Sequence, residues 1–211
     1  MIIRQLISAC LSGILVGIGG TALFSTDQAF IGSFLFTFGL FFILMYRLHL
    51  FTGKVGYLLG SKRVFAAEVL ITWVGNWVGT YAVARLIRLT RLTGVVERAR
   101  ELVAVKLSDT PVSLMILAFF CGMLMYLAVH TYRIAPNAAL QVLAIFLPVL
   151  VFAGIGFEHC IANMYFFSLS GAWTVQKWVY LLLITLGNTL GGLFVPVVRQ
   201  YLLKEKDSYG A

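Results

Sequence analysis

Six long apolar stretches alternate with short polar stretches along the chain. Each approaches or reaches the roughly 20 residues that a helix needs to cross the apolar core of a bilayer. The stretches fall into two groups of three. The first group covers residues 6–24, 29–46 with a continuation past Gly53, and 69–83. The second covers residues 110–129, 138–157 with a continuation to Leu169, and 178–198. We therefore expect an all-α integral membrane protein with six transmembrane helices.

A polar stretch at residues 85–109 separates the two groups of spans. It mixes six basic and three acidic residues with Leu, Ile and Val at roughly helical spacing, which is typical of an amphipathic helix at a membrane surface. Six spans place both chain ends on one side of the membrane, but the basic residues are divided too evenly to fix which side. We predict one membrane domain over residues 1–211, with a first repeat at about 1–90, an amphipathic connection at about 85–109 and a second repeat at about 110–203.

The two groups of spans carry matching sequence features. The third and sixth spans both contain the pattern G-N-x-x-G, at residues 75–79 and 187–191. Each group also has a break in its middle span, at residues 50–54 and 156–159. Counted from Thr52 and His159, the breaks precede the matching Asn by 24 and 29 residues. Because each group has an odd number of spans, a duplication has to be inverted in the membrane, as in many transporters that build a site at the midplane.

The composition supports a membrane protein and excludes several other classes. The chain is 61% apolar and 11% charged, with a mean hydropathy of +0.95, far from the composition of soluble domains. Its net charge of +8 is not gathered in a polar basic tail, so neither disorder nor nucleic-acid binding is expected. The cysteines, Cys10, Cys121 and Cys160, lack the spacing of disulfide frameworks or zinc sites. We expect no metal and no cofactor.

Glu158 and His159 stand out because they lie about 20 residues into an otherwise uncharged segment. Ionisable groups inside a bilayer are costly and persist mainly where they face a cavity or a partner, which predicts a functional site. Two alternatives stay open: Glu158 hydrogen-bonds the broken backbone, and His159 is a hydrogen-bonded interior residue. Thr52 lies at the corresponding break, so an inverted repeat brings its hydroxyl near His159. The pair offers uncharged donors to a small anion, although Thr52 also suits a helix N-cap.

Apolar residues near both breaks have the placement of constrictions that exclude hydrated ions. Leu50 and Phe51 flank Thr52, while Leu40 and Phe152 lie roughly two to three turns before their breaks. Core packing is the alternative for any of the 17 Phe residues of the chain. Asn76 and Asn188, in the two G-N-x-x-G patterns, have amide groups that suit support of the broken backbone better than ligand binding.

Several of these segments match the motifs of a known family. Residues 157–164 read F-E-H-x-x-A-N-M, residues 50–52 read L-F-T, and the two G-N-x-x-G patterns accompany them. The chain resembles the formate/nitrite transporter family over nearly its whole length. The resemblance implies an aquaporin-like inverted 3+3 repeat, a homopentamer in the cell membrane with cytoplasmic termini, and a pore in each protomer. It also implies passive or proton-coupled transport of formate, nitrite or hydrosulfide.

The resemblance also implies roles for individual residues. It makes Thr52 and His159 the central polar pair. The implied outer constriction is formed by Leu40 and Phe152, and the inner one by Leu50, Phe51 and Phe36. Vestibule charge is expected from Arg4, from Lys106 at the start of the fourth span, and from Lys54, whose T-G-K context is similar to that of hydrosulfide channels. Structural support is expected from Glu158, Asn163, Asn76 and Asn188. Gly122 departs from the family, since relatives often carry a pore-facing Asn there.

Other functions are distinguishable in the sequence. A hydrosulfide channel of the same family is the nearest alternative. A water or glycerol channel also joins two broken helices, but its paired N-P-A motifs are absent from this sequence. An intramembrane enzyme would use Glu158, His159 and Cys160, yet no G-x-S-x-G motif or paired His/Glu metal motif accompanies them. The expected partners are other copies of the chain, lipid, a small anion and protons, without nucleic acid.

Overall fold

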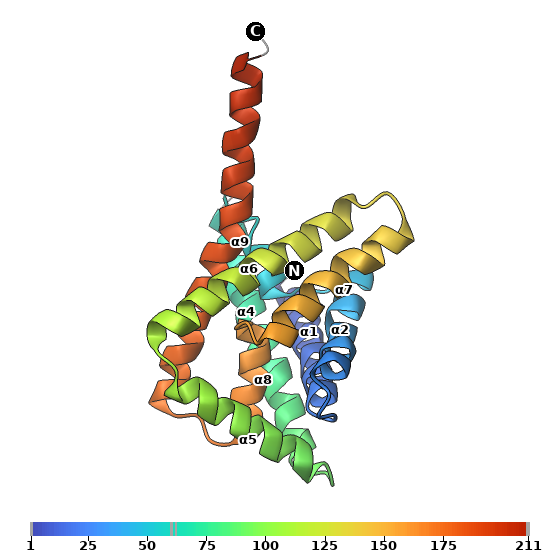
Figure 1. The fold of residues 1–211 in the computed structure, drawn as a ribbon, viewed down its shortest axis with the longest axis vertical. Helices are drawn as coiled ribbons and strands as arrows, with labels where there is room; N and C mark the ends of the chain where they lie inside the picture. Colours follow the sequence, from blue (N-terminus) through green and yellow to red (C-terminus); the bar gives the residue numbers. More distant parts are fainter. Residues whose placement is uncertain (1, 60, 62, 210–211) are drawn as a thin grey trace.

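The part of the chain that the computed structural model describes is entirely helical and loop. It comprises residues 2–59, 61 and 63–209, with side chains up to Leu202. In chain order the helices are α1 (Ile2–Leu23), α2 (Ala29–Met45), α3 (Phe51–Val55), α4 (Arg63–Ile87), α5 (Thr93–Ser108), α6 (Pro111–Ile134), α7 (Ala138–Ile155), α8 (Cys160–Ser170) and α9 (Val175–Tyr209). Figure 1 shows the long helices side by side, with α5 across one end and the last turns of α9 projecting from the other.

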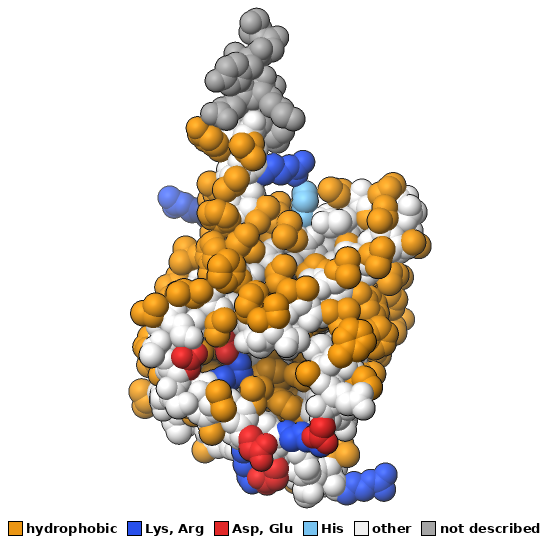
Figure 2. Space-filling view, in the orientation of Figure 1, with side chains coloured by type: hydrophobic (Ala, Val, Ile, Leu, Met, Phe, Trp, Pro, Cys, Tyr) orange, Lys and Arg blue, Asp and Glu red, His pale blue; other side chains and the backbone are white. Residues whose placement is uncertain are grey.

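The helices make six spans, which confirms the predicted architecture. By length and composition, α1, α6, α7 and α9 up to Leu202 are able to cross a membrane, and α2 and α8 are shorter apolar helices. α2 with α3 forms one broken span and α7 with α8 forms another. α4 has 25 residues and buries polar Thr72, Asn76 and Thr80. In Figure 2 apolar side chains cover the middle of the molecule and charged ones gather toward its two ends.

The two halves pack through the same close helix contacts. α1 lies along α4, and α6 lies along α9. Gly13 of α1 touches the backbone oxygen of Asn76, and Gly122 of α6 touches the backbone oxygen of Asn188, so closely that neither position has room for a Cβ atom. Gly122 thus lies at a helix crossing, where small residues let backbones approach.

Asn76 and Asn188 hold the two breaks in the same way. Each accepts a hydrogen bond from the first N–H of the short helix after the break, and donates one bond to a carbonyl before the break and another to a neighbouring long helix. The partners of Asn76 are Phe51, His49 and Ala9. Those of Asn188 are Cys160, Glu158 and Ala118. Buried backbone groups that the breaks would leave unpaired are thereby satisfied.

These bonds also show which residues of the two repeats correspond. Leu50 is the N-cap of α3 and His159 is the N-cap of α8. The structural counterpart of His159 is therefore Leu50, and Thr52, expected at the corresponding break, lies two residues further along, in α3. The break before α8 follows Gly156, whose φ of 88° ends α7 in the left-handed conformation that glycine adopts without strain.

The predicted amphipathic connection is present as α5, and residues 85–87 belong to the end of α4 instead. α5 buries Val95, Val96, Ala99 and Val103 and packs against α8. Lys106 also lies in α5, in its last turn. It was expected at the start of the fourth span, but α6 begins only at Pro111. The position in α5 turns the Lys106 side chain inward, where it is 6% exposed.

Candidate functional site

Three successive cavities lie along the centre of the helix bundle. The terminal-side cavity has a volume of about 470 Å³ and is lined by residues that include Arg47, Leu50, Lys54 and Arg133. The narrow cavity holds only about 10 Å³ and is lined by residues that include Phe36, Leu40, Leu50, Phe152 and His159. The α5-side cavity has about 590 Å³ and is lined by residues that include Phe36, Asp27, Lys106, Asp109, Phe152, Glu158 and His159.

Shared lining residues join these cavities into one row. Leu50 lines both the terminal-side and the narrow cavity. Phe36, Phe152 and His159 line both the narrow and the α5-side cavity. The volume of the narrow cavity is close to that of one water-sized sphere. The row is therefore wide at both ends, and at His159 it narrows to a space for about one small molecule.

His159 uses its two ring nitrogens for different partners. Nδ1 accepts a hydrogen bond of 3.2 Å from the backbone N–H of Ala162, which caps α8. Nε2 lies 2.9 Å from Oγ1 of Thr52. Because Nδ1 acts as an acceptor, the neutral ring carries its proton on Nε2 and donates it to Thr52. The structure thus brings Thr52 and His159 together from different repeats.

The Thr52–His159 pair has the chemistry of a neutral donor site. Both side chains are buried, and the ring of Phe152 covers His159 at a centroid distance of 5.5 Å. Since Oγ1 accepts from Nε2, the hydroxyl proton of Thr52 is available to a further acceptor. A neutral donor offers hydrogen bonds to an anion without the fixed charge that would hold it in place.

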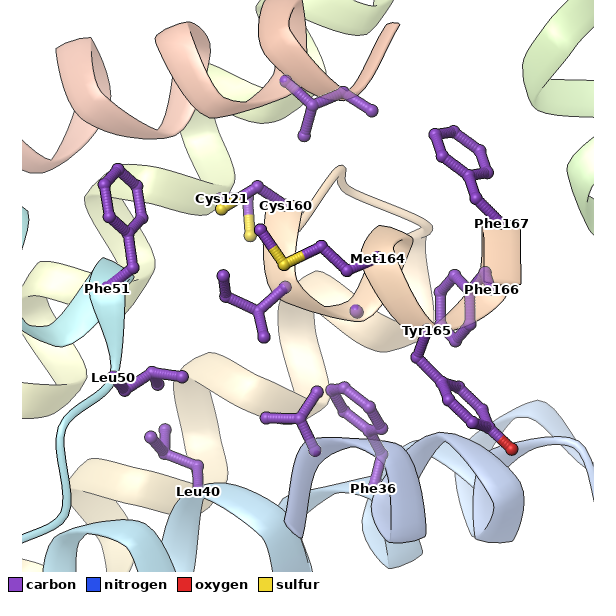
Figure 3. Close-up of a cluster of buried hydrophobic side chains, with 14 of the residues drawn as sticks. Phe36, Leu40, Leu50, Phe51, Cys121, Cys160, Met164, Tyr165, Phe166 and Phe167 are labelled. Atoms are coloured by element: carbon purple, nitrogen blue, oxygen red, sulfur yellow. The ribbon is translucent and has the colours of Figure 1, made fainter. Parts of the chain in front are cut away.

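The apolar residues at the narrow cavity differ in part from the predicted set. Phe36 packs edge to face on Phe152 with ring centroids 6.0 Å apart, so it lies beside Phe152 instead of joining an inner ring with Phe51. Leu40 and Leu50 line the same cavity. Figure 3 shows them close together, whereas Phe51 points away. Residues of both predicted rings therefore line the narrow cavity, and Phe51 is not among them. The division into an inner and an outer ring stays a prediction.

Glu158 is part of a buried ion pair beside the site. Its Oε1 lies 2.5 Å from Nζ of Lys106, and its Oε2 accepts a 2.8 Å hydrogen bond from Asn163. Asn163 also donates to the backbone oxygen of His159. Both carboxylate oxygens therefore have partners. Lys106 neutralises the charge of Glu158, and the bonds through Asn163 hold the backbone segment that carries His159. Sequence spacing gave no sign of the pairing, because α5 has no counterpart in the first repeat.

The other expected vestibule charges lie at the opposite end of the row. Lys54 lines the terminal-side cavity and lies 3.4 Å from Glu68. Arg4 is not among the residues that line this cavity and instead borders a separate hollow with Glu68 and His49. Arg47 and Arg133, which the sequence analysis did not single out, line the terminal-side cavity itself. Their positions just after α2 and near the end of α6 were the available signal, since mouths of a pore lie at span ends.

Comparison with known proteins places this arrangement in a family. The model of the family described as Formate/nitrite transporter matches residues 1–202. The chain belongs to the formate/nitrite transporter family. It is 29% identical over 210 residues to the nitrite transporter NirC of Escherichia coli, covering 88% of this chain and 78% of NirC. It is also 28% identical over 196 residues to an uncharacterised transporter of Bacillus subtilis, covering 85% and 74%.

Other relatives are much longer than the matched region. An uncharacterised transporter of Saccharomyces cerevisiae is 28% identical over 195 residues, which cover 82% of this chain but 31% of the yeast protein.

Among solved structures, a pentameric formate channel with formate bound superposes with a TM-score of 0.83 at 23% identity, over 96% of this chain and 97% of that one. An FNT family ion channel superposes with a TM-score of 0.82 at 28% identity, over 95% and 90%.

These similarities settle the general class of the protein. Membership of the family makes this chain a multi-pass membrane protein of a transporter family. Its relatives are transporters and channels, so an intramembrane enzyme is not supported.

Proposed function

We propose that the chain transports small monovalent anions of weak acids, formate or nitrite, along the row of cavities within each protomer. The observation that carries the proposal is His159, which bonds to Thr52 and lines a narrow cavity of about 10 Å³ between cavities of about 470 and 590 Å³. Formate and nitrite have three heavy atoms each. Larger or strongly hydrated ions have to lose more water than the one free donor of the pair replaces.

The proposed transport step follows from the polarity along the row. An anion enters a wide cavity and meets the apolar walls formed by Phe36, Leu40, Leu50 and Phe152, where a charge is costly. The hydroxyl of Thr52, which is oriented by the N–H of His159, offers a hydrogen bond that offsets part of this cost. Protonation of the anion near this pair removes the remaining charge, and the neutral acid crosses. Transport is then passive for the anion or coupled to a proton.

The hydrogen bonds of His159 bear on which group gives the proton for this step. Nδ1 of His159 is occupied by the N–H of Ala162, so the ring has no second acceptor through which to regain a proton given up at Nε2. We therefore propose that the proton comes from the solution and is relayed by water at the pair, which takes up one proton from the solution for each one that it passes to the anion. The nearby Lys106–Glu158 pair keeps the backbone at His159 in place.

The proposed assembly is a homopentamer in the cell membrane with cytoplasmic chain ends. The pentameric formate channel that shares the fold supports this number of subunits. Large apolar side chains on the outside of the bundle, including Phe30, Leu70 and Leu147, suit contact with lipid or neighbouring copies.

A proteoliposome panel tests the proposed function. Formate, nitrite, hydrosulfide, acetate and chloride are offered at two pH values, with protein-free liposomes as the control. We expect formate or nitrite to cross fastest, acetate more slowly and chloride at the protein-free rate. Preference for hydrosulfide would support the alternative that the T-G-K sequence at Lys54 suggests. Equal rates with and without protein for every anion would contradict the proposal.

A further inference from the structure

The two wide cavities carry charges of opposite sign. Among the described residues, the terminal-side cavity is lined by three cationic residues, Arg47, Lys54 and Arg133, and by no carboxylate. The α5-side cavity is lined by the carboxylates of Asp27, Asp109 and Glu158, and by the single cation Lys106. The difference lies in the side chains of the two cavities and in α5, which lines the α5-side cavity alone of the two.

Ion pairs reduce the difference but do not remove it. Lys106 is neutralised by Glu158, Lys54 by Glu68 and Asp27 by Arg98. In the described part of the chain, the charges without such a partner are those of Arg47 and Arg133 at the terminal-side cavity and that of Asp109 at the α5-side cavity. Among the residues that the structure describes, neither arginine has an acidic group within ion-pair distance. The guanidinium of Arg133 lies over the ring of Tyr57 at 4.5 Å, a contact that leaves its positive charge in place.

Arg47 is also held in an unusual backbone conformation. Its φ is 53°, and it is the one non-glycine residue with positive φ in the described chain. Residues other than glycine, asparagine and aspartate rarely adopt this conformation, and such strain collects at functional positions. Glycine or asparagine would fit the turn after α2 with less strain, yet neither would supply a cation at the cavity rim.

We propose that the terminal-side cavity is an anion-collecting site and that the α5-side cavity is not, so that transport saturates at lower anion concentration from the terminal side. This inference rests on the proposed function. A unit charge about 8 Å from the anion, in a water-like medium, changes its local concentration on the order of twofold. Such effects add over several charges in a cleft and fade with ionic strength.

The side of the membrane follows from the position of the cavity. Arg133 is in the last turn of α6, and His130 one turn earlier bonds to Arg199 near the end of α9 at 2.8 Å. The collecting cavity thus faces the side on which the chain leaves the membrane. For a passive pathway the ratio of maximal rate to half-saturating concentration is equal in both directions, so the terminal side has the lower half-saturating concentration and the lower maximal rate.

The test measures saturation separately from each side. Vesicles are sorted by orientation with a protease-sensitive tag at the C-terminus, and formate flux is measured against concentration in both populations. We expect a lower half-saturating concentration from the terminal side. The double variant Arg47→Gln/Arg133→Gln should raise it about fourfold, from two charges at about twofold each, on that side only. The effect should shrink at high salt. Arg91→Gln, an exposed cation on the loop before α5, is the control and should change nothing.

Two additions keep the result decisive. Arg47→Gly removes the same charge while relieving the backbone, so it should raise the half-saturating concentration about twofold without lowering thermal stability. If no formate flux is found, pyrophosphate binding to the solubilised protein is measured instead. Weaker binding by the double variant than by Arg91→Gln would then support the cavity as an anion site. Equal saturation from both sides in active protein, or equal pyrophosphate binding by all variants in inactive protein, would overturn the inference.

Discussion

The two nitrogens of His159 determine what its side chain offers to an anion. Nδ1 completes the first turn of α8, and Nε2 donates to Thr52. Protonation of Nδ1 would place two N–H donors against each other, so the capping bond favours the neutral ring. The same residue therefore fixes the start of the helix and keeps permanent positive charge out of the constriction.

Replacing Thr52 tests the donor pair at a single atom. Thr52→Val keeps the shape of the side chain but removes the hydroxyl, which leaves the buried Nε2–H of His159 without its partner. This costs about 1–3 kcal/mol, and we expect formate flux in proteoliposomes to fall about tenfold or more. Thr52→Ser keeps the hydroxyl and should retain most of the flux. Equal flux in the valine and serine variants would contradict the role of the hydroxyl.

Replacing Lys106 alone should destabilise the protein more than replacing Lys106 and Glu158 together. Lys106→Met leaves the buried carboxylate uncompensated, and loss of one partner of a buried pair costs about 3–5 kcal/mol. The double variant Lys106→Met/Glu158→Gln removes both charges and should regain most of that stability. Thermal unfolding in detergent measures the coupling. Additive effects of the two substitutions on thermal stability would show that the 2.5 Å contact contributes no coupling energy between the two residues.

At the level of the helices, the breaks were readable from the sequence and their register was not. Glycine, charge and the repeated G-N-x-x-G pattern marked where the middle spans stop being regular. Asn76 and Asn188 bond to backbone that lies 25 to 30 residues away in sequence. The correspondence of Leu50 with His159 depends on those bonds, which is why counting from Thr52 gave a shift of two residues.

The two asparagines should be equally important for folding. Asn76→Leu and Asn188→Leu each leave two backbone groups at the break without a hydrogen bond, the first N–H of the short helix and one carbonyl before it, at about 1–3 kcal/mol per buried group. We expect both variants to lose most of their folded yield or to unfold at clearly lower temperature than wild type. A strong effect of one substitution with no effect of the other would contradict the equivalence of the two breaks.

Gly122 provides a test of helix packing with an internal control. An added Cβ would collide with the backbone of Asn188, so Gly122→Ala should force α6 and α9 apart and lower thermal stability. Gly94, in the first turn of α5, has nothing within 4 Å of an added Cβ. Gly94→Ala should leave stability unchanged or raise it by up to about 1 kcal/mol, because alanine loses less backbone entropy in a helix. A stability loss in Gly94→Ala that matches Gly122→Ala would refute this packing argument.

For the whole molecule, the apolar pattern predicted the spans because a bilayer demands long apolar helices. The amphipathic connection was also visible as periodic charge. What it contacts was not, since Lys106 and Glu158 are 52 residues apart and meet only when α5 lies back over α8. The cavity charges escaped notice for a similar reason: Arg47 and Arg133 resemble ordinary charges at span ends until the fold places them around one space. The division into repeats at about residues 1–90 and 110–203 stays a prediction.

The central claim is that anions cross the protein at the Thr52–His159 pair. The most direct test is formate and nitrite flux through His159→Asn in proteoliposomes, with Gly94→Ala as the control. The asparagine side chain keeps an oxygen that can cap α8, but it does not reproduce the donor that reaches Thr52. We predict thermal stability near that of wild type and flux of both anions lowered about 10-fold or more, because the Thr52 hydroxyl, no longer oriented by His159, loses a hydrogen bond to the anion worth about 1.5–3 kcal/mol. Unchanged flux in a stable His159→Asn protein would contradict the account.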